Sequence, residues 1–214
     1  MSSASDNPYF QIGLDVAGRP CLIMGGGAEA EDKAIRLAEA RAELIVVSEH
    51  VTPRLKALAD EDRLVWHRRS FQMSDLDGTH LVVNTIEDTP LARQVYERAC
   101  EKRLLINTYD QPGYSNFGMA ALVHPGPLRI SISTSNASPA LASRLRQDLE
   151  QLFDQEFVEF ISQLGQVRQH LRERIHNSAT RKDLLRSLVT DFHLQGTLKY
   201  PPNWREKLES LLAE

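Results

Sequence analysis

The residues whose types and spacing most clearly suggest chemistry are three consecutive glycines, Gly25–Gly27, which directly follow an apolar run. With Ala30 they fit the pattern G-x-G-x-x-A, at a place where a strand would end and a helix would begin. In this pattern the first glycine permits a tight turn, the third lets the backbone approach a pyrophosphate, and the alanine allows close helix packing. Amides of the first helical turn, at Ala28 and Glu29, would bind the phosphates. The pattern predicts a dinucleotide site; the alternative is a glycine turn that serves only the fold.

An acidic residue is expected about 20 positions further on, where it would bind the adenine ribose. Glu49 follows the next apolar run and is in range, and Ser48 is the neighbouring choice. A carboxylate there disfavours a 2′-phosphate, so NAD is expected rather than NADP, although Arg54 nearby keeps NADP open. Thr85, which ends the run Leu81–Thr85, completes the expected set of cofactor-binding residues.

Asp110 lies just after another apolar run, where ligands of open α/β sheets bind. It could act as a general base beside a nicotinamide, because oxidation by hydride loss also releases a proton. The alternative is an aspartate that caps a turn before Pro112 and Gly113.

Hydroxyl side chains are concentrated in the segment Ser131–Ser138. Ser133 and Thr134 could bind carboxylates or an anion, whereas Ser138 is expected to cap a helix that opens with Pro139. His124 is the histidine expected nearest to a site, with a turn histidine as the alternative. The histidines form no metal-type pair, so no metal ligand is expected.

The elements that must position these residues alternate between short apolar runs and helical patterns. Strands are expected at Cys21–Met24, Leu44–Val47, Leu64–Arg68, Leu81–Thr85 and Leu104–Asn107. Helices are expected at Ala28–Ala40, Thr52–Asp60 and Pro90–Lys102. This alternation is typical of a parallel sheet covered by helices.

The pattern changes after Asp110. Gln111–Gly126 is expected to be a loop-rich boundary, and the alternation in Leu128–Thr134 predicts a half-exposed antiparallel strand. An apolar stripe then runs from Leu145 to Ile175, with a break expected near Asp154 or Gly165. Shorter helices are expected at Asp183–Phe192 and Trp204–Leu212.

Composition limits the function classes. The chain has 214 residues, 42% of them hydrophobic, and a net charge of −4, which argues against a nucleic-acid binder. Basic residues are frequent between Arg144 and Arg186, which indicates either a solvated helix face or a surface for a carboxylate-rich ligand. Cys21 and Cys100 are expected to be core residues of a cytoplasmic protein, and no apolar run is long enough to span a membrane.

Three segments together are similar to one family, the precorrin-2 dehydrogenase/sirohydrochlorin ferrochelatase family, which includes the N-terminal module of siroheme synthase and its stand-alone relatives. The similar region runs from about Phe10 to Glu150. The segments are Cys21–Gly27 (CLIMGGG) with Lys33 downstream, Ile106–Asp110 (INTYD), and Ile130–Ala142 (ISISTSNASPALA) with Arg146. The Ser-Pro segment is the most specific, because general Rossmann domains lack it.

The resemblance implies an α/β protein with a Rossmann-like parallel sheet, followed by a small β dimerisation segment and a C-terminal α-helical domain. The corresponding boundaries are an NAD-binding domain at 1–112, a dimerisation segment at 113–150 and a helical domain at 151–214. It also implies a homodimer.

The resemblance further implies NAD-dependent dehydrogenation of precorrin-2 to sirohydrochlorin, with Asp110 as the catalytic residue. Some members also insert ferrous iron, which would add a ferrochelatase (lyase) activity. The family's conserved hydroxyl falls on Thr134, beside Ser133. The expected substrate-binding residues are Asn107, Phe117, His124, Ser133 and Thr134.

The chain also departs from the family pattern. Glu29–Lys33 (EAEDK) replaces Val-Ala-x-Arg-Lys, Asn136 replaces a glycine, and Phe117–Ala121 (FGMAA) lacks the proline of Phe-x-x-Pro-Ala. The alternative function is therefore a non-catalytic relative that binds NAD or a tetrapyrrole.

Overall fold

The computed structural model describes residues 10–135, 137–196 and 203. The chain divides into two compact units, Met1–Leu152 and Phe153–Glu214, and each is described by itself. No helix among the described residues combines the length and the apolar character that crossing a membrane would require.

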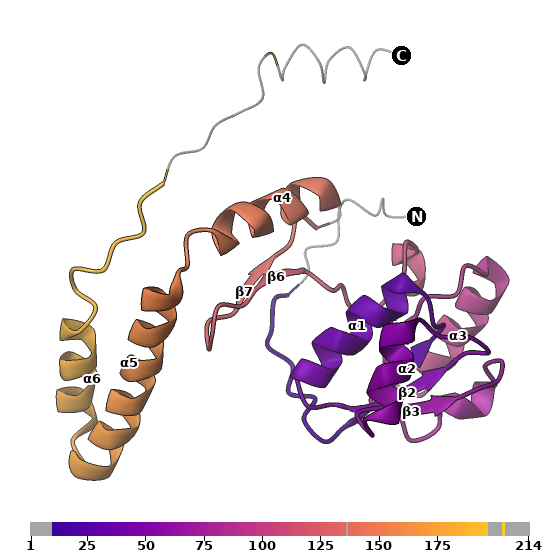
Figure 1. Cartoon of the computed structure of the whole chain (residues 1–214), viewed down its shortest axis with the longest axis horizontal. Helices are drawn as coiled ribbons and strands as arrows, with labels where there is room; N and C mark the ends of the chain where they lie inside the picture. The colour runs from indigo at the N-terminus through magenta and orange to yellow at the C-terminus, as the bar shows by residue number, and fades with distance from the viewer. Residues whose placement is uncertain (1–9, 136, 197–202, 204–214) are drawn as a thin grey trace. The chain divides into compact units, whose positions relative to one another are not determined.

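In the first unit, α1, α2 and α3 lie around a β-sheet (Figure 1). This sheet has five parallel strands in the order β3-β2-β1-β4-β5. Its strands are β1 (Pro20–Met24), β2 (Glu43–Val47), β3 (Val65–His67), β4 (Leu81–Asn84) and β5 (Leu105–Thr108). All four neighbouring pairs are parallel. The predicted Rossmann-like parallel sheet is therefore confirmed.

Helices follow these strands as the sequence predicts. They are α1 (Ala28–Glu39), α2 (Pro53–Asp60) and α3 (Thr89–Glu101), with short 3₁₀ turns η2 (Met73–Leu76) and η3 (Pro112–Tyr114). The side chains of Thr52 and Asp88 accept hydrogen bonds from the first turns of α2 and α3, and each first turn contains a proline. These caps fix where both helices begin.

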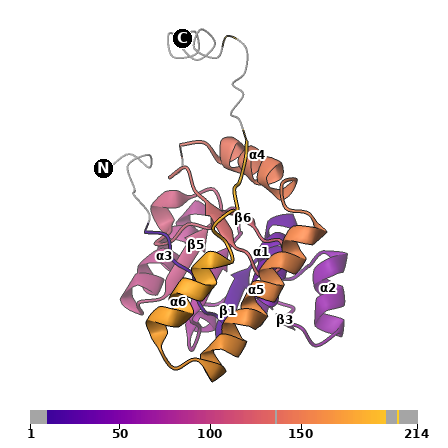
Figure 2. The same cartoon turned by 90° about the vertical axis from the view of Figure 1, so that its left-hand side faces the viewer.

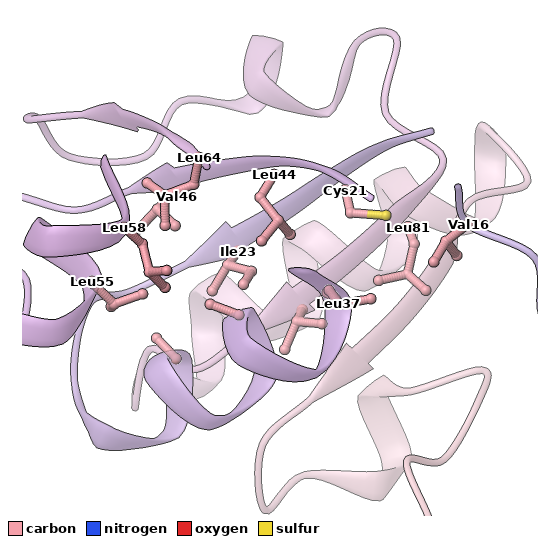
Figure 3. Close-up of a cluster of buried hydrophobic side chains, with 13 residues drawn as sticks. Val16, Cys21, Ile23, Leu37, Leu44, Val46, Leu55, Leu58, Leu64 and Leu81 are labelled. Carbon is pink, nitrogen blue, oxygen red and sulfur yellow. The ribbon is translucent and has the colours of Figure 1, made fainter. Parts of the chain in front are cut away.

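Alternate residues of β1 enter two different hydrophobic clusters, because successive side chains of a strand point to opposite faces of the sheet. Cys21 and Ile23 join the cluster that α1 and α2 cover (Figure 3). Leu22 and Met24 join the cluster beneath α3. Burial on both faces explains why the strand is an unbroken apolar run.

Cys100 differs from the expectation that it is a core residue. It is exposed, because the face of α3 that packs on the sheet consists of Ala92, Val95 and Ala99. Cys21 is buried as expected.

The segment predicted to be loop-rich contains a strand that the sequence pattern did not indicate. β6 (Ala121–Val123) pairs antiparallel with β7 (Ile130–Ile132), so only β7 was predicted. At three residues, β6 is too short to show a period of its own, and its pairing with β7 stabilises it. The helix α4 (Pro139–Glu150) then begins at Ser138, whose side chain accepts a hydrogen bond from the Leu141 amide as predicted.

The second unit contains α5 (Gln155–Arg174) and α6 (Ser178–Ser187). The apolar stripe breaks at Asp154, which caps α5, and Gly165 lies inside the helix. α6 begins and ends about one turn earlier than expected, because Asn177 caps it by accepting from the Ala179 and Thr180 amides. The helix predicted at Trp204–Leu212 lies outside the described residues.

Candidate functional site

The glycine turn connects the end of β1 to the start of α1. Gly25 has φ +104°, and a Cβ on it would lie 2.3 Å from Oγ1 of Thr85. A Cβ on Gly26 would lie 2.1 Å from the carbonyl oxygen of His50. The tight turn predicted for Gly25 is thus present, and both positions exclude any larger residue.

Gly27 has different surroundings. It is the N-cap of α1, it has an extended backbone without a side-chain cap, and a Cβ on it would meet no atom within 4 Å. The first backbone bond of the helix is from the Glu31 amide to the Gly27 oxygen, so the amides of Ala28, Glu29 and Ala30 precede it. Open space therefore lies beside Gly27 at the helix N-terminus, where the free amides suit an anionic group.

The other predicted cofactor residues surround this turn but already have hydrogen-bond partners. The Thr85 hydroxyl donates to the Met24 oxygen at 2.8 Å, and the Ser48 hydroxyl donates to the His50 oxygen at 2.7 Å. Glu49 is exposed and accepts from the Ser70 hydroxyl at 2.6 Å. Of these three side chains, the Glu49 carboxylate retains most capacity to accept another hydrogen bond.

Asn84 is a residue of this region that the sequence reasoning missed. It ends β4 next to β1, where the strand order reverses, and it is completely buried. Its Oδ1 accepts from the Ile86 amide at 3.0 Å, but its Nδ2 has no partner among the described residues. A buried donor without a partner costs about 1–3 kcal/mol, so a group that accepts from it would be stabilising there. The only sequence signal is an amide that closes the apolar run Leu81–Val83.

Asp110 lies at the tip of β5, one strand beyond β4. It is exposed and has φ +52°, a left-handed conformation that aspartate tolerates better than most residues. The backbone amide of the preceding residue, Tyr109, donates to the backbone carbonyl oxygen of Asn84 at 2.9 Å. This hydrogen bond joins the tips of β4 and β5.

The side chain of Tyr109 is influenced by a carboxylate in the first turn of α1. The nearby carboxylate of Glu29 is the main cause that raises the pKa of Tyr109, with further contributions from partial burial, Asp110 and Glu87. Glu29 belongs to the first turn of α1. Asp110, which follows β5, and the N-terminus of α1, which follows β1, thus lie at the same carboxyl edge of the parallel sheet, two strands apart.

The predicted substrate residues fall into two groups. Asn107 donates to the Phe117 carbonyl at 3.0 Å, and the Phe117 side chain packs against the hydrophobic cluster under α1 and α2. The other three, His124, Ser133 and Thr134, line a cavity of about 690 Å³ in the first unit. Asn107, Phe117 and Asp110 do not line this cavity.

The cavity lies between α1, the β6–β7 hairpin and α4. Four cationic side chains line it, Lys33, Arg36, Arg129 and Arg146, together with three carboxylates, Asp32, Glu39 and Glu150. Arg36 donates to the Ala120 oxygen at 2.9 Å, which ties α1 to the segment before β6. Among the described residues, no three His, Cys, Asp or Glu side chains converge as in a metal site.

A family model and several known proteins are similar to this chain, and the family model covers the glycine turn. A family model described as "Putative NAD(P)-binding" matches residues 12–121. A siroheme synthase of Nitrosococcus oceani is 32% identical over 172 residues, which cover 80% of this chain and 36% of that protein. A siroheme synthase of Citrobacter koseri is 32% identical over 190 residues, which cover 89% of this chain and 42% of that protein. The chain thus spans well under half the length of these relatives.

A solved structure named "SirC, precorrin-2 dehydrogenase" superposes with a TM-score of 0.73 at 22% identity, covering 96% of this chain and 100% of that chain. At this identity the similarity shows a shared fold. The matches to siroheme synthases confirm the resemblance found in the sequence. Because the family model covers more than half of the chain and contains the glycine turn, the chain belongs to the family of NAD(P)-binding proteins that this model describes.

Proposed function

We propose that this chain is an NAD-dependent dehydrogenase that oxidises precorrin-2 to sirohydrochlorin. The observation that carries the proposal is the position of two features at the carboxyl edge of the same parallel sheet: the open N-terminus of α1 after Gly27, which follows β1, and Asp110, which follows β5 two strands away. The relatives that are siroheme synthases and the SirC fold supply the substrate class.

The residues present fit a dinucleotide. The space before Gly27 and the amides of Ala28 and Glu29 suit a pyrophosphate, and the unpartnered Nδ2 of Asn84 offers a buried donor at the switch point. We assign Glu49 to the adenine ribose hydroxyls, which favours NAD over NADP. Gly25, Gly26, Ser48 and Thr85 then shape the turn against which the cofactor lies.

The chemistry divides between cofactor and protein. When bound, NAD⁺ supplies the hydride acceptor, and the substrate also loses one proton for each hydride. Asp110 accepts that proton, because its carboxylate is exposed at the sheet edge. The hydrogen bond from the Tyr109 amide to the backbone carbonyl oxygen of Asn84 holds the backbone next to Asp110 in place.

We assign the tetrapyrrole contacts to the two groups of residues described above. The cavity that includes His124, Ser133 and Thr134 offers hydroxyls and cations for carboxylates. Asn107 and Phe117 shape the backbone that leads from β5 towards Met119, which lines the same cavity.

The direct test is incubation of the protein with precorrin-2 and NAD⁺, monitored by the sirohydrochlorin absorbance spectrum and by NADH formation. The proposal predicts both signals in equal amounts. Binding of NAD without turnover would instead support the non-catalytic relative.

Asp110→Asn is expected to lower the rate of dehydrogenation by about 100-fold or more, since positioned acid–base groups contribute this much. Asparagine removes the charge yet tolerates the left-handed backbone at φ +52°. Asp62→Asn is a matched control, because Asp62 is also exposed and has φ +55°. An Asp110→Asn variant as active as the control would remove Asp110 from the mechanism.

Three further properties belong to the proposal. A homodimer follows from the family resemblance, and light scattering of the purified protein at micromolar concentration tests it. A cytoplasmic location suits the two free cysteines, and cell fractionation tests it. Addition of Fe²⁺ to the completed reaction tests whether a ferrochelatase activity accompanies the dehydrogenase.

A further inference from the structure

The helical unit has a basic groove between α5 and α6, which pack side by side (Figure 2). The groove has a volume of about 540 Å³. Five cationic side chains line it: Arg168 and Arg172 from α5, and Arg181, Lys182 and Arg186 from α6. Ser178, Leu185 and Val189 complete the lining within the described part of the chain.

Among the residues that the structure describes, no carboxylate lines this groove. Glu173 and Asp183 belong to the same two helices but are not among the lining residues. The ion pairs among the described residues all involve other cations, from Lys33 to Arg146. Five like charges concentrated without compensation create a positive potential that an anionic ligand would lower.

The arrangement of the cations is partly fixed. Arg168 and Arg172 lie four residues apart, as do Lys182 and Arg186, so each pair occupies one helix face. Arg181 donates to the carbonyl oxygens of Ile175 and His176 in the connection between the helices. Its guanidinium is therefore held at one end of the groove, with further donors available.

We propose that the α5–α6 groove binds the carboxylates of the tetrapyrrole, an inference that rests on the proposed function. Guanidinium groups bind carboxylates through paired hydrogen bonds, and a tetrapyrrole with acetate and propionate arms presents several carboxylates around one ring. Leu185 and Val189 add a small apolar surface between the cations. The groove volume falls in the range of small-molecule sites.

The test compares two double variants of the full-length chain. Arg172→Gln with Lys182→Gln removes one cation from each side of the groove, and glutamine preserves helix propensity. Arg93→Gln with Arg98→Gln is the matched control: both arginines are exposed on α3 and paired with Glu97 and Glu101. Both variants lose the same net charge, so a difference between them reports the position of the charges.

Sirohydrochlorin is titrated into each protein at low and at high salt, with circular dichroism to establish that the helices are intact. The groove variant is expected to bind about 10-fold more weakly at low salt, on the basis of two charge contacts at an exposed site. Its affinity should also fall less steeply with salt, because fewer contacts are screened. The control should stay within about twofold of the wild type, and the octamethyl ester of sirohydrochlorin should abolish the difference between the variants.

The outcomes separate this inference from the proposed function. Turnover of precorrin-2 with equal sirohydrochlorin affinity in both double variants would overturn the groove and leave the dehydrogenase in place. Sirohydrochlorin binding that the groove variant loses, without turnover in the wild type, would support the groove and overturn the dehydrogenase. A wild type that fails to bind sirohydrochlorin would overturn both. Displacement of sirohydrochlorin from the groove by a DNA or RNA oligonucleotide of higher affinity would overturn the assignment to a tetrapyrrole.

Discussion

At the scale of single residues, the three glycines after β1 have three different roles. Gly25 adopts a positive φ beside Thr85, and Gly26 lies against the His50 carbonyl, so both are needed for the fold. Gly27 faces open space and has an ordinary negative φ. A glycine that the fold itself does not require is most simply explained by a ligand that must come close to the backbone.

Gly27→Ala is therefore expected to leave the protein folded while it weakens NAD binding by about 10-fold or more, because the new methyl group occupies space needed by the pyrophosphate. Titration of NADH fluorescence measures the affinity, and thermal unfolding measures the stability. Gly113→Ala serves as the control, since a Cβ there also meets no atom within 4 Å. Unchanged affinity in Gly27→Ala would place the pyrophosphate elsewhere.

At the scale of elements, side-chain caps and short-range pairs decide where helices begin and how loops are held. Thr52, Asp88, Ser138, Asp154 and Asn177 each accept from amides in the first turn of a helix. The loop before β4 is likewise held by hydrogen bonds to a side chain, the carboxylate of Asp75. These contacts lie within a few residues along the chain, so each element keeps its boundary largely independent of the rest.

The loop before β4 depends on Asp75. Its carboxylate accepts two hydrogen bonds from Arg69, at 2.8 and 2.6 Å, and one from the Gln72 amide at 2.8 Å. The Arg69 hydrogen bonds are the main cause that lowers the pKa of Asp75. Because the pKa is lower in the folded state, the stabilisation is present above the ordinary carboxyl pKa and disappears as the pH falls through the lowered value.

Asp75→Asn is accordingly expected to reduce the free energy of unfolding by about 1 kcal/mol at neutral pH, and the deficit should shrink below about pH 4. Urea unfolding at pH 7 and at pH 3.5 measures this. Asp60→Asn, which breaks an exposed pair with Lys56, should have little effect at either pH. A deficit for Asp75→Asn that is independent of pH would show that the charge is not responsible.

Gly165 offers a test of the long helix in the second unit. It lies in the interior of α5, is exposed, and has no atom within 4 Å of an added Cβ. Gly165→Ala is expected to stabilise the helix by up to about 1 kcal/mol, the difference in helix propensity between these residues. A higher urea midpoint of the far-UV circular dichroism signal would support this, whereas a lower midpoint would mean that the glycine allows a close contact.

At the scale of the whole molecule, the division into two units predicts how the cofactor acts on stability. The proposed NAD residues all belong to the unit Met1–Leu152. A ligand stabilises only the structure to which it binds, by about 2.7 kcal/mol at 100 times its dissociation constant. Hydrogen exchange with saturating NAD should therefore slow in β1 and α1. Unchanged exchange in both elements would contradict the placement of the cofactor at the glycine turn.

The sequence by itself determined the strands and helices of the parallel sheet and the tight glycine turn that follows β1. The strands and helices from β1 to β5 follow from apolar runs, caps and prolines, all of which act over a few residues. The tight turn at Gly25 could also be predicted, because backbone conformation is a local property, whereas the cofactor role of Gly27 stays a prediction.

Only the tertiary structure decided which chemical groups meet. The proximity of Glu29 and Tyr109, the unpartnered amide of Asn84 and the pairing of β6 with β7 all depend on contacts between segments far apart in the sequence. The same holds for the basic groove, whose cations are spread over two helices and become concentrated only when α5 and α6 pack together. Local patterns carry no information about such contacts, because burial and electrostatic potential depend on distances in space rather than on separation along the chain.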